Sequence, residues 1–471
     1  MDIIKKWGVT SVLFLVTAVL LTACGGGGGS SSPNVAPTVT PTVTSTSPIN
    51  VATYVPINST ISATFSEAMT LSQPASATFK VAPSAGGSTV LGKVSFNSLG
   101  WTFTPSANLA PSTAYTAIIT GAVASNGVAM ASPYTWSFTT TGGFIYSGDA
   151  NNGSVSSWGF SAGILSSTAL STSGAGGALS VAVDPSGNYL YSANYNNGSL
   201  SSYSVTGGLV SSAPITTTTS ISGSAPLNIA VDPSGKFLYE TDYNTGSVWS
   251  YSITNGALST NPVSTVHDTN LGPNSIVVDP TGAYVYVARN SEFGDYGVAS
   301  YATSNGTLTY AGSASDPNAT NLNDQPNSMV QSGNFLFVAG AGYGYIASYK
   351  ITGGALTYTT EIPFQYAPSD TDFLAADPSG KYLYVAEVNG GVILTYSIGA
   401  NNGTLTLLST TNATGASPMY IAVGPTGNHL YVTDKSSGYL SSYSITNGFL
   451  SFVSQSVSGL SGGGSSIAVA P

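Results

Sequence analysis

Apolar and small polar residues alternate along most of the chain, and Gly, Asn, Pro and Ser interrupt the alternation at short intervals. Between residues 47 and 141 this period of two is visible in TISATFSEAM, KVSFNSLGWTFTPS, STAYTAIITGAV and YTWSFTT. Such alternation predicts strands that bury one face and expose the other. About 95 residues with several short strands are typical of a β-sandwich, so we predict this fold for residues 47–141.

A different pattern starts at residue 142, where a unit of four short alternating segments recurs. In one copy the segments read SVAVD, NYLYSAN, SLSSYSV and a variable fourth run. Periods near 50 residues indicate propellers or solenoids, and four antiparallel strands make one propeller blade. A turn glycine marks the copies at spacings of 47, 48 or 51 residues, at Gly187, Gly235, Gly282, Gly333, Gly380 and Gly427.

The two ends of the repeat region complete one another. Within a unit, an aromatic residue of the second segment lies 12 positions before one of the third, as in Tyr191 and Tyr203. Tyr146 and Trp158 keep this spacing without a first segment before them, and the chain ends on SSIAVAP, a first segment without its unit. Pairing these ends closes a ring and removes exposed sheet edges. We therefore predict an all-β protein in which residues 142–471 form a seven-bladed β-propeller closed by the C-terminal strand.

The N-terminus adds an export signal to this picture. Two lysines precede the apolar run VTSVLFLVTAVLL, which is too short to remain as a membrane span. The run ends in LTAC, which resembles the bacterial lipobox and implies cleavage before Cys24 and lipidation of that residue. We predict a lipoprotein signal peptide in residues 1–23 and a lipidated cysteine with a flexible linker in residues 24–46.

Composition excludes some classes of protein. Charged residues make up 6% of the chain, and its formal net charge is −10. Nine basic residues leave no footprint for nucleic acid, and a single cysteine, Cys24, permits no disulfide within the chain. Because Gly25 follows it instead of Asp, we expect an outer-membrane lipoprotein that faces the periplasm or the cell surface. We further expect the protein to be a monomer that is attached to the membrane through the lipid on Cys24.

Four aspartates recur in a DP-[ST]-G turn between the first and second segments of a unit. Asp at the first turn position accepts a backbone hydrogen bond, Pro presets φ, and Gly tolerates positive φ. A catalytic residue has no reason to recur in four equivalent turns, so we interpret these residues as structural: Asp184, Asp232, Asp279 and Asp377.

Other acids lie at the end of the second segment or in the loops of the opposite face, where propellers usually bind ligands. We predict that 12 of the 17 propeller acids lie on or near this face, including Asp149, Asp242, Asp268, Asp295, Glu387 and Asp434. Either they cap the turns that follow, or they form a site for a cation or a polar ligand. Oxygen-rich loops suit Ca²⁺, but the chain contains no complete calcium-loop spacing, so we assign no metal.

The fourth unit departs from the others by three extra residues, which fall within the nine-residue stretch RNSEFGDYG. It contains Arg289, the only arginine, with Glu292 and Asp295, while His267 and Asp268 lie in the loop before this unit. We therefore name His267, Arg289 and Glu292 as candidate catalytic residues, with His267 as base and Arg289 stabilising an oxyanion. The alternative is a solvated ion pair in a longer loop.

Two resemblances add to this interpretation. FSEAM, WTFTP and TWSFTT resemble the bacterial Ig-like domain of cell-surface proteins, which implies a spacer or an adhesive role. DPSGKYLYVAE, GSVWSYSI and NGALS resemble the seven-bladed lactonase family, which includes 6-phosphogluconolactonase, and also YVTN-type surface propellers. That resemblance implies His and Arg side chains on the loop face that meet an anionic substrate. Where a His might stand, this chain has Asn228, Asn274, Asn327 and Tyr420.

We therefore expect a cell-envelope lipoprotein whose propeller is a ligand-binding, protein-binding or scaffold module with an acidic loop face. Only Arg289 and Lys435 are basic near that face, so a phosphosugar fits poorly beside 12 acids. One alternative is a lactonase-type hydrolase that acts on an uncharged or carbohydrate lactone. Another is a structural surface protein without a small ligand.

Overall fold

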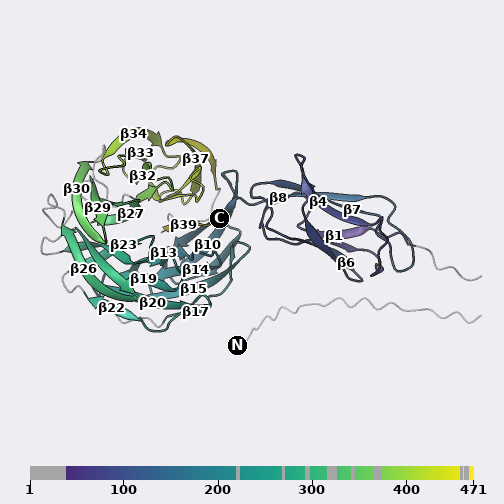
Figure 1. Ribbon diagram of the computed structural model, residues 1–471, viewed down its shortest axis with the longest axis horizontal. Coiled ribbons are helices and arrows are strands. Elements are labelled where there is room, and N and C mark those ends of the chain that lie inside the picture. The colour runs from purple at the N-terminus through teal and green to yellow at the C-terminus, as the bar shows by residue number, and fades with distance from the viewer. Residues whose placement is uncertain are drawn as a thin grey trace, which may run out of the picture.

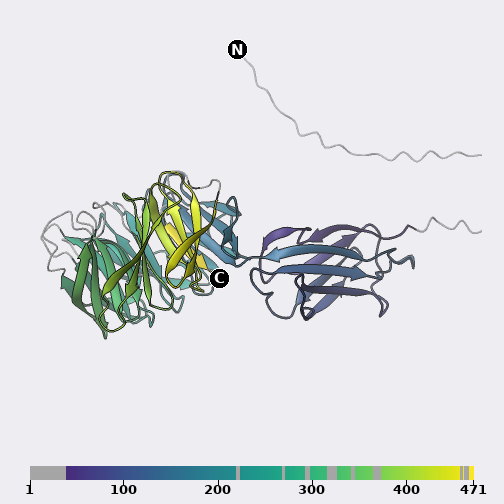
Figure 2. The same ribbon diagram turned by 90° about the horizontal axis from the view of Figure 1, so that it is seen from above.

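The computed structural model describes residues 39–218, 223–267, 271–291, 297–315, 326–340, 345–363, 373–456, 460 and 466–470. All regular elements in these ranges are strands, which confirms the predicted all-β class (Figures 1 and 2). The predicted signal peptide and Cys24 lie outside the described residues. No apolar helix long enough to cross a membrane occurs in the part of the chain that the structure describes.

The N-terminal unit is a sandwich of two four-stranded sheets, ordered β1-β3-β6-β5 and β2-β8-β7-β4. Its core contains Phe79, Trp101, Tyr115 and Trp136, which are all buried at the inward positions of the alternating pattern. The strands are β1 (Val43–Ser47), β2 (Ala52–Val55), β3 (Ile61–Phe65), β4 (Thr78–Pro83), β5 (Gly92–Phe96), β6 (Gly100–Pro105), β7 (Ala114–Thr120) and β8 (Tyr134–Thr140).

Seven further sheets form the propeller, one for each predicted blade. We name the strands of a blade A to D in sheet order from the propeller axis outward. In blades 1 to 3 strand D is interrupted, so two short pieces pair with strand C. These blades contain β39 (Ser466–Ala470), β9 (Gly143–Asp149), β10 (Ser154–Ser161), β11 (Ile164–Leu165) and β12 (Ser171–Gly174); β13 (Ala178–Val183), β14 (Tyr189–Asn194), β15 (Ser199–Thr206), β16 (Leu209–Val210) and β17 (Thr216–Thr217); and β18 (Pro226–Val231), β19 (Phe237–Asp242), β20 (Ser247–Thr254), β21 (Ala257–Leu258) and β22 (Ser264–His267).

Blades 4 to 7 each have four continuous strands in simple antiparallel order. They contain β23 (Leu271–Val278), β24 (Tyr284–Ser291), β25 (Gly297–Ser304) and β26 (Thr307–Ser315); β27 (Pro326–Ser332), β28 (Phe335–Gly340), β29 (Tyr345–Thr352) and β30 (Ala355–Pro363); β31 (Phe373–Ala376), β32 (Tyr382–Glu387), β33 (Val392–Ile398) and β34 (Leu405–Asn412); and β35 (Pro418–Val423), β36 (His429–Asp434), β37 (Leu440–Thr446) and β38 (Phe449–Gln455).

Blade 1 is assembled from both ends of the repeat region. All five residues of β39 pair with β9 in antiparallel register, from Ser466 opposite Gly148 to Ala470 opposite Phe144. β39 therefore serves as strand A of blade 1, and the ring closes as predicted. No turn joins strands A and B in this blade, because they come from distant parts of the chain (Figure 1).

Neighbouring blades are held together by one contact that is repeated around the ring. A ring at the start of strand B in one blade packs against the C–D turn glycine of the next blade; it belongs to the first residue of the strand in blades 2 to 7 and to the second in blade 1. At Gly306 a Cβ atom would lie 2.5 Å from ring atoms of Phe237, so only glycine fits. The seven pairs are Phe144–Gly208, Tyr189–Gly256, Phe237–Gly306, Tyr284–Gly354, Phe335–Gly403, Tyr382–Gly448 and His429–Gly163.

Candidate functional site

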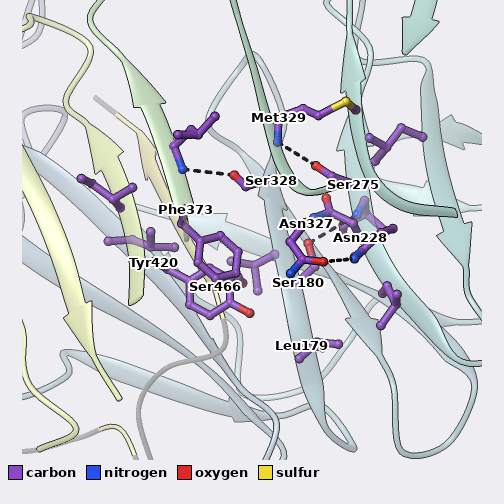
Figure 3. A pocket seen from close by; sticks show the side chains of 18 residues that line it. Leu179, Ser180, Asn228, Ser275, Asn327, Ser328, Met329, Phe373, Tyr420 and Ser466 are labelled. Carbon is purple, nitrogen blue, oxygen red and sulfur yellow. Dashed lines mark hydrogen bonds between the residues drawn. The ribbon is translucent and has the colours of Figure 1, made fainter. Parts of the chain in front are cut away.

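A cavity of about 420 Å³ lies on the propeller axis, between the A strands of the seven blades (Figure 3). Each blade contributes at the same register position, which lies four residues before the A–B turn in blades 2 to 7 and at the first residue of β39 in blade 1. The residues at this position are Ser180, Asn228, Ser275, Ser328, Phe373, Tyr420 and Ser466. Because strand A is the innermost strand of each blade, this position is brought from all seven blades to one shared space, and flanking residues such as Leu179 and Val181 line it as well.

Three of the serines also connect adjacent blades. Ser180 Oγ accepts a hydrogen bond from the Ile229 amide at 3.3 Å, and Ser275 Oγ accepts one from Met329 at 3.2 Å. Ser328 Oγ accepts one from the Leu374 amide at 3.1 Å (Figure 3). Each hydroxyl is fixed in place by the next blade and retains its own proton for donation to a ligand.

An amide pair forms another part of the wall. Asn274 Nδ2 donates to Asn327 Oδ1 at 2.7 Å across two blades. The Asn274 backbone carbonyl accepts a hydrogen bond from Thr241 Oγ1, also at 2.7 Å, which fixes the strand that carries it. The Asn274 amide has a second N–H and a carbonyl oxygen besides the N–H that makes this bond. Asn228, on the neighbouring blade, adds a third amide to the wall.

Two aromatic rings form the opposite part of the wall. The centroids of Phe373 and Tyr420 lie 4.0 Å apart with an interplanar angle of 40° (Figure 3). The Tyr420 amide donates to Thr433 Oγ1 at 3.2 Å. Burial raises the pKa of Tyr420, so its hydroxyl stays neutral at physiological pH. The pair offers the apolar surface of the cavity on which a ring can stack.

The cavity has no countercharge for an ionic ligand. Among the described residues that line it, none carries a charged side chain. An anion there would lose its hydration without gaining a charge-assisted hydrogen bond from Arg or Lys. The combination of hydroxyls, amides and one aromatic surface instead suits an uncharged molecule that bears hydroxyl groups.

The structure buries the loop-face acids that it describes. Asp149, Asp242, Glu387 and Asp434 end their B strands, and none is more than 3% exposed. Asp242 accepts hydrogen bonds from the amides of Ala225 at 2.7 Å and Thr245 at 2.8 Å. Glu387 accepts one from the Gly390 amide at 2.8 Å. These contacts are those of turn caps.

Asp434 shows the electrostatic consequence of such capping. It accepts hydrogen bonds from the amides of Ser417 and Ser437, both at 2.8 Å, and from Ser436 at 3.1 Å. Burial alone would raise its pKa, but these bonds outweigh burial and lower the pKa below its ordinary value. The carboxylate is thus ionised and used internally.

The expectation of an acidic loop face concerns 12 acids, of which the structure describes fewer than half. Of the 12 acids assigned to it, five are described, namely Asp149, Glu240, Asp242, Glu387 and Asp434, and all are buried. The others lie outside the described residues: Asp268, Glu292, Asp295, Asp316, Asp324, Asp370 and Asp372. No group of three or more His, Cys, Asp or Glu side chains placed for a metal ion is found in the described ranges.

The structure does not gather the candidate catalytic residues at the cavity. His267 is exposed at the end of β22, the outer strand of blade 3, and its Nδ1 lies 2.8 Å from Ser247 Oγ. Arg289 is 4% exposed on β24, the second strand of blade 4. Neither residue lines the central cavity. The third candidate, Glu292, lies outside the described residues.

The turn aspartates make the hydrogen bonds expected of their motif. Asp184 Oδ1 accepts from the Tyr189 amide at 2.8 Å, and Asp184 Oδ2 accepts from the Ser186 amide at 3.1 Å. Asp232 and Asp377 repeat this pattern in blades 3 and 6. Asp279 accepts from Thr281 at 2.9 Å and from Gln331 Nε2 at 3.2 Å. All four lie on the face opposite the B-strand ends.

The fold and the axial cavity define an all-β propeller with a small-molecule cavity at its centre. The chain matches the seven-bladed β-propeller lactonases over residues 119–411 and 365–467. Because these segments span more than half of its length, the chain belongs to the seven-bladed β-propeller lactonase family. Residues 37–140 match the bacterial Ig-like domain. Both resemblances seen in the sequence are therefore confirmed.

Several solved structures share the propeller fold. A candidate 6-phosphogluconolactonase from Bacteroides uniformis is 17% identical with a TM-score of 0.61, over 69% of this chain and 99% of its own. The periplasmic gluconolactonase of Pseudomonas aeruginosa is 17% identical with a TM-score of 0.60, over 70% and 99%. A protein from Lactobacillus plantarum is 20% identical with a TM-score of 0.59, over 70% and 99%. A comparison with curated proteins finds no match.

Proposed function

We propose that this protein is a cell-envelope lipoprotein whose propeller binds a small, uncharged, hydroxyl-bearing ligand in the axial cavity. The observation that supports this most directly is the cavity wall of serine hydroxyls, asparagine amides and one aromatic pair, with no charged side chain among its described residues. Hydroxyls and amides both donate and accept, as a polyol requires. A sugar or sugar lactone has this chemistry and can stack its ring on Tyr420.

Ligand binding can be tested by isothermal titration of the purified mature chain with glucono-1,5-lactone, its 6-phosphate and glucose, with and without chelator. We expect binding of an uncharged compound and none of the phosphate, since the wall offers no cation. Replacing Tyr420 by Ala should weaken binding about 10-fold through lost stacking and apolar contact. Tyr195→Ala, at an exposed tyrosine away from the cavity, is the matched control. Equal affinities in both variants would contradict the proposal.

Envelope anchoring is supported by the LTAC sequence and the flexible residues that follow it. The wild-type chain should fractionate with membranes and acquire radiolabelled palmitate. A Cys24→Ser chain should lose the label and become soluble after export. Recovery of both chains in the same soluble fraction would contradict the anchor and leave the ligand test unaffected.

A second candidate function is hydrolysis of an uncharged lactone, which family membership and the shared fold of the periplasmic gluconolactonase favour. In this reaction water adds to the carbonyl carbon, the ring C–O bond breaks, and a base takes the proton of the water. His267 and Arg289 are the residues to test. Lactone turnover above the spontaneous rate that disappears in His267→Ala and Arg289→Ala would support the assignment. Unchanged turnover would remove both residues from it.

A further inference from the structure

A second cavity lies where blade 1 lacks its A–B turn. In blade 2 this place is filled by the turn of residues 184–188, but in blade 1 strand A ends at Ala470 and strand B begins at Gly143. A cavity of about 370 Å³ opens beside Gly143, between the A–B turns of blade 2 and blade 7. Loops of the Ig-like domain, together with residues of blades 1 and 2 such as Phe144 and Val205, form the rest of the wall, so the cavity is lined by both domains.

The walls of this cavity are held by hydrogen bonds across the domain boundary. Tyr54 Oη donates to the Leu165 carbonyl at 2.8 Å, and the Ala162 amide donates to Ser112 Oγ at 2.9 Å. In the connecting segment, Thr141 Oγ1 donates to the Phe160 carbonyl at 2.9 Å. These bonds fix the Ig-like domain against blade 1 on one side of the cavity, and the space beside them remains open.

The lining is mainly apolar and contains no charged side chain among the described residues. Pro56, Ile57, Pro111, Phe144 and Val205 supply the apolar surface. Asparagine and threonine side chains stand at the rim. A volume of this size lies in the range of ligand cavities, and apolar cavities shielded from water bind apolar rings.

One hydroxyl group stands out in this lining. Tyr146 is 1% exposed, and its hydroxyl makes no hydrogen bond with any described residue. Burial, with Asp184 nearby, raises its pKa, so the phenol remains a neutral donor and acceptor. The equivalent residue of blade 2, Tyr191, also has an unpartnered hydroxyl, but it is fully buried and does not line this cavity. Because the turn is missing in blade 1, the Tyr146 hydroxyl faces the cavity, whereas the Tyr191 hydroxyl of blade 2 does not.

We propose that the interdomain cavity is a second ligand site, which takes a small apolar ring compound carrying one hydroxyl group. The ring packs against Phe144 and the prolines, and the hydroxyl of the ligand pairs with that of Tyr146. Because the walls come from both domains, the bound compound fixes their relative orientation. This site is independent of the axial cavity, since no residue lines both.

The test uses p-cresol and its isostere p-xylene, in which a methyl group replaces the hydroxyl, and isothermal titration of the mature chain. We expect saturable binding of one p-cresol, several-fold tighter than p-xylene. In Tyr146→Phe, p-cresol should lose about 2- to 10-fold in affinity and approach p-xylene, because one hydrogen bond is removed. In Tyr191→Phe, the matched control, affinity should not change.

Blocking the opening of the interdomain cavity provides a second, independent test. Thr426 is exposed at the rim, so Thr426→Trp should fill the opening without disturbing the core and abolish p-cresol binding. Glucose or gluconolactone should not compete with p-cresol, which separates this site from the axial one. Absence of saturable p-cresol binding at millimolar concentration would overturn the proposal. Binding that persists unchanged in Thr426→Trp would place the compound elsewhere and would overturn it equally.

Discussion

The two ends of the A strands differ in how far their residue types are repeated from blade to blade. At the turn end the same residue recurs, as Asp184, Asp232, Asp279 and Asp377, and each accepts a hydrogen bond from the backbone amide two residues further on. Four residues earlier, the equivalent positions hold serine in four blades, asparagine in one and an aromatic residue in two. Repetition therefore serves architecture, because these four blades make the same turn between strands A and B. The residue type at the cavity position differs between blades, so the cavity wall is asymmetric although the ring is nearly symmetric. An asymmetric wall is what a non-symmetric ligand requires.

The most severe way to break this comparison is to open the ring. A chain that ends at residue 465 lacks β39, so blade 1 loses strand A and the cavity loses the wall at Ser466. We expect loss of the compact propeller and of ligand binding, since β9 and the adjoining core become exposed. Size-exclusion chromatography and thermal melting measure the effect. A compact truncated chain with the wild-type melting temperature would contradict it.

A smaller effect is expected at a repeated glycine. Gly306 has φ of 78° and its Cβ position lies 2.5 Å from Phe237, so Gly306→Ala should cost about 3 kcal/mol through strain and overpacking. Gly353→Asn is the control, because Asn305 occupies the equivalent turn position in blade 4 at φ of 50°. It should change the free energy of unfolding by less than about 0.5 kcal/mol. Chemical denaturation measures both variants.

Removing a turn carboxylate should affect stability and spare the cavity. Asp232→Ala leaves the amides of Ser234, Lys236 and Phe237 without their acceptor, at a cost of about 2 kcal/mol. Affinity for the axial ligand should remain within twofold. Tyr420→Ala should show the reverse, with weakened binding and a smaller loss of stability. If Asp232→Ala weakened binding as strongly as Tyr420→Ala, the two ends of the strand would not be separable.

The smallest expected effect concerns Glu240, a position that does not line the axial cavity and that holds a different residue in other blades. Glu240 is buried between blades 2 and 3, and its Oε2 has no hydrogen-bond partner. Burial, followed by the charge of Asp242, raises its pKa well above the ordinary value. The unfolded chain therefore loses this proton at lower pH than the folded chain, so stability falls as pH rises from the unfolded pKa near 4.5.

Glu240→Gln removes this titration. We expect a higher melting temperature than wild type at pH 7 and a difference that shrinks towards pH 4. The isosteric amide keeps the volume of the side chain, so the pH dependence separates titration from packing. A constant difference between pH 4 and pH 8 would show that the carboxyl group does not titrate on unfolding.

Much of the architecture was predictable because short sequence motifs determine it and recur in each repeat unit. The spacing of Tyr191 and Tyr203, the DPSG turns and the unpaired SSIAVAP segment together predicted seven blades and their closure. The interrupted D strands of blades 1 to 3 were not predicted, since their short apolar runs carry little signal.

The cavity was predictable only in part. The sequence singled out Asn228, Asn274, Asn327 and Tyr420 as positions where an enzyme might carry histidine, and all four line the cavity. The pairing of Phe373 with Tyr420 depends on the contact between the A strands of two neighbouring blades, which no local pattern encodes. The direction of the strand-end acids was equally hidden, because an Asp before a turn can face inward as a cap or outward to solvent.

The closing strand has a consequence for how this protein is made. β9 leaves the ribosome before residues 150–465, yet it cannot complete its blade until β39 has been synthesised. The most non-local pairing of the molecule is therefore also the last to become possible, and such pairings are slow. Throughout elongation the nascent chain carries an unsatisfied strand edge that invites intermolecular pairing. Premature termination anywhere between β9 and β39 leaves that edge permanently open, so a closed ring reports that translation has passed β39.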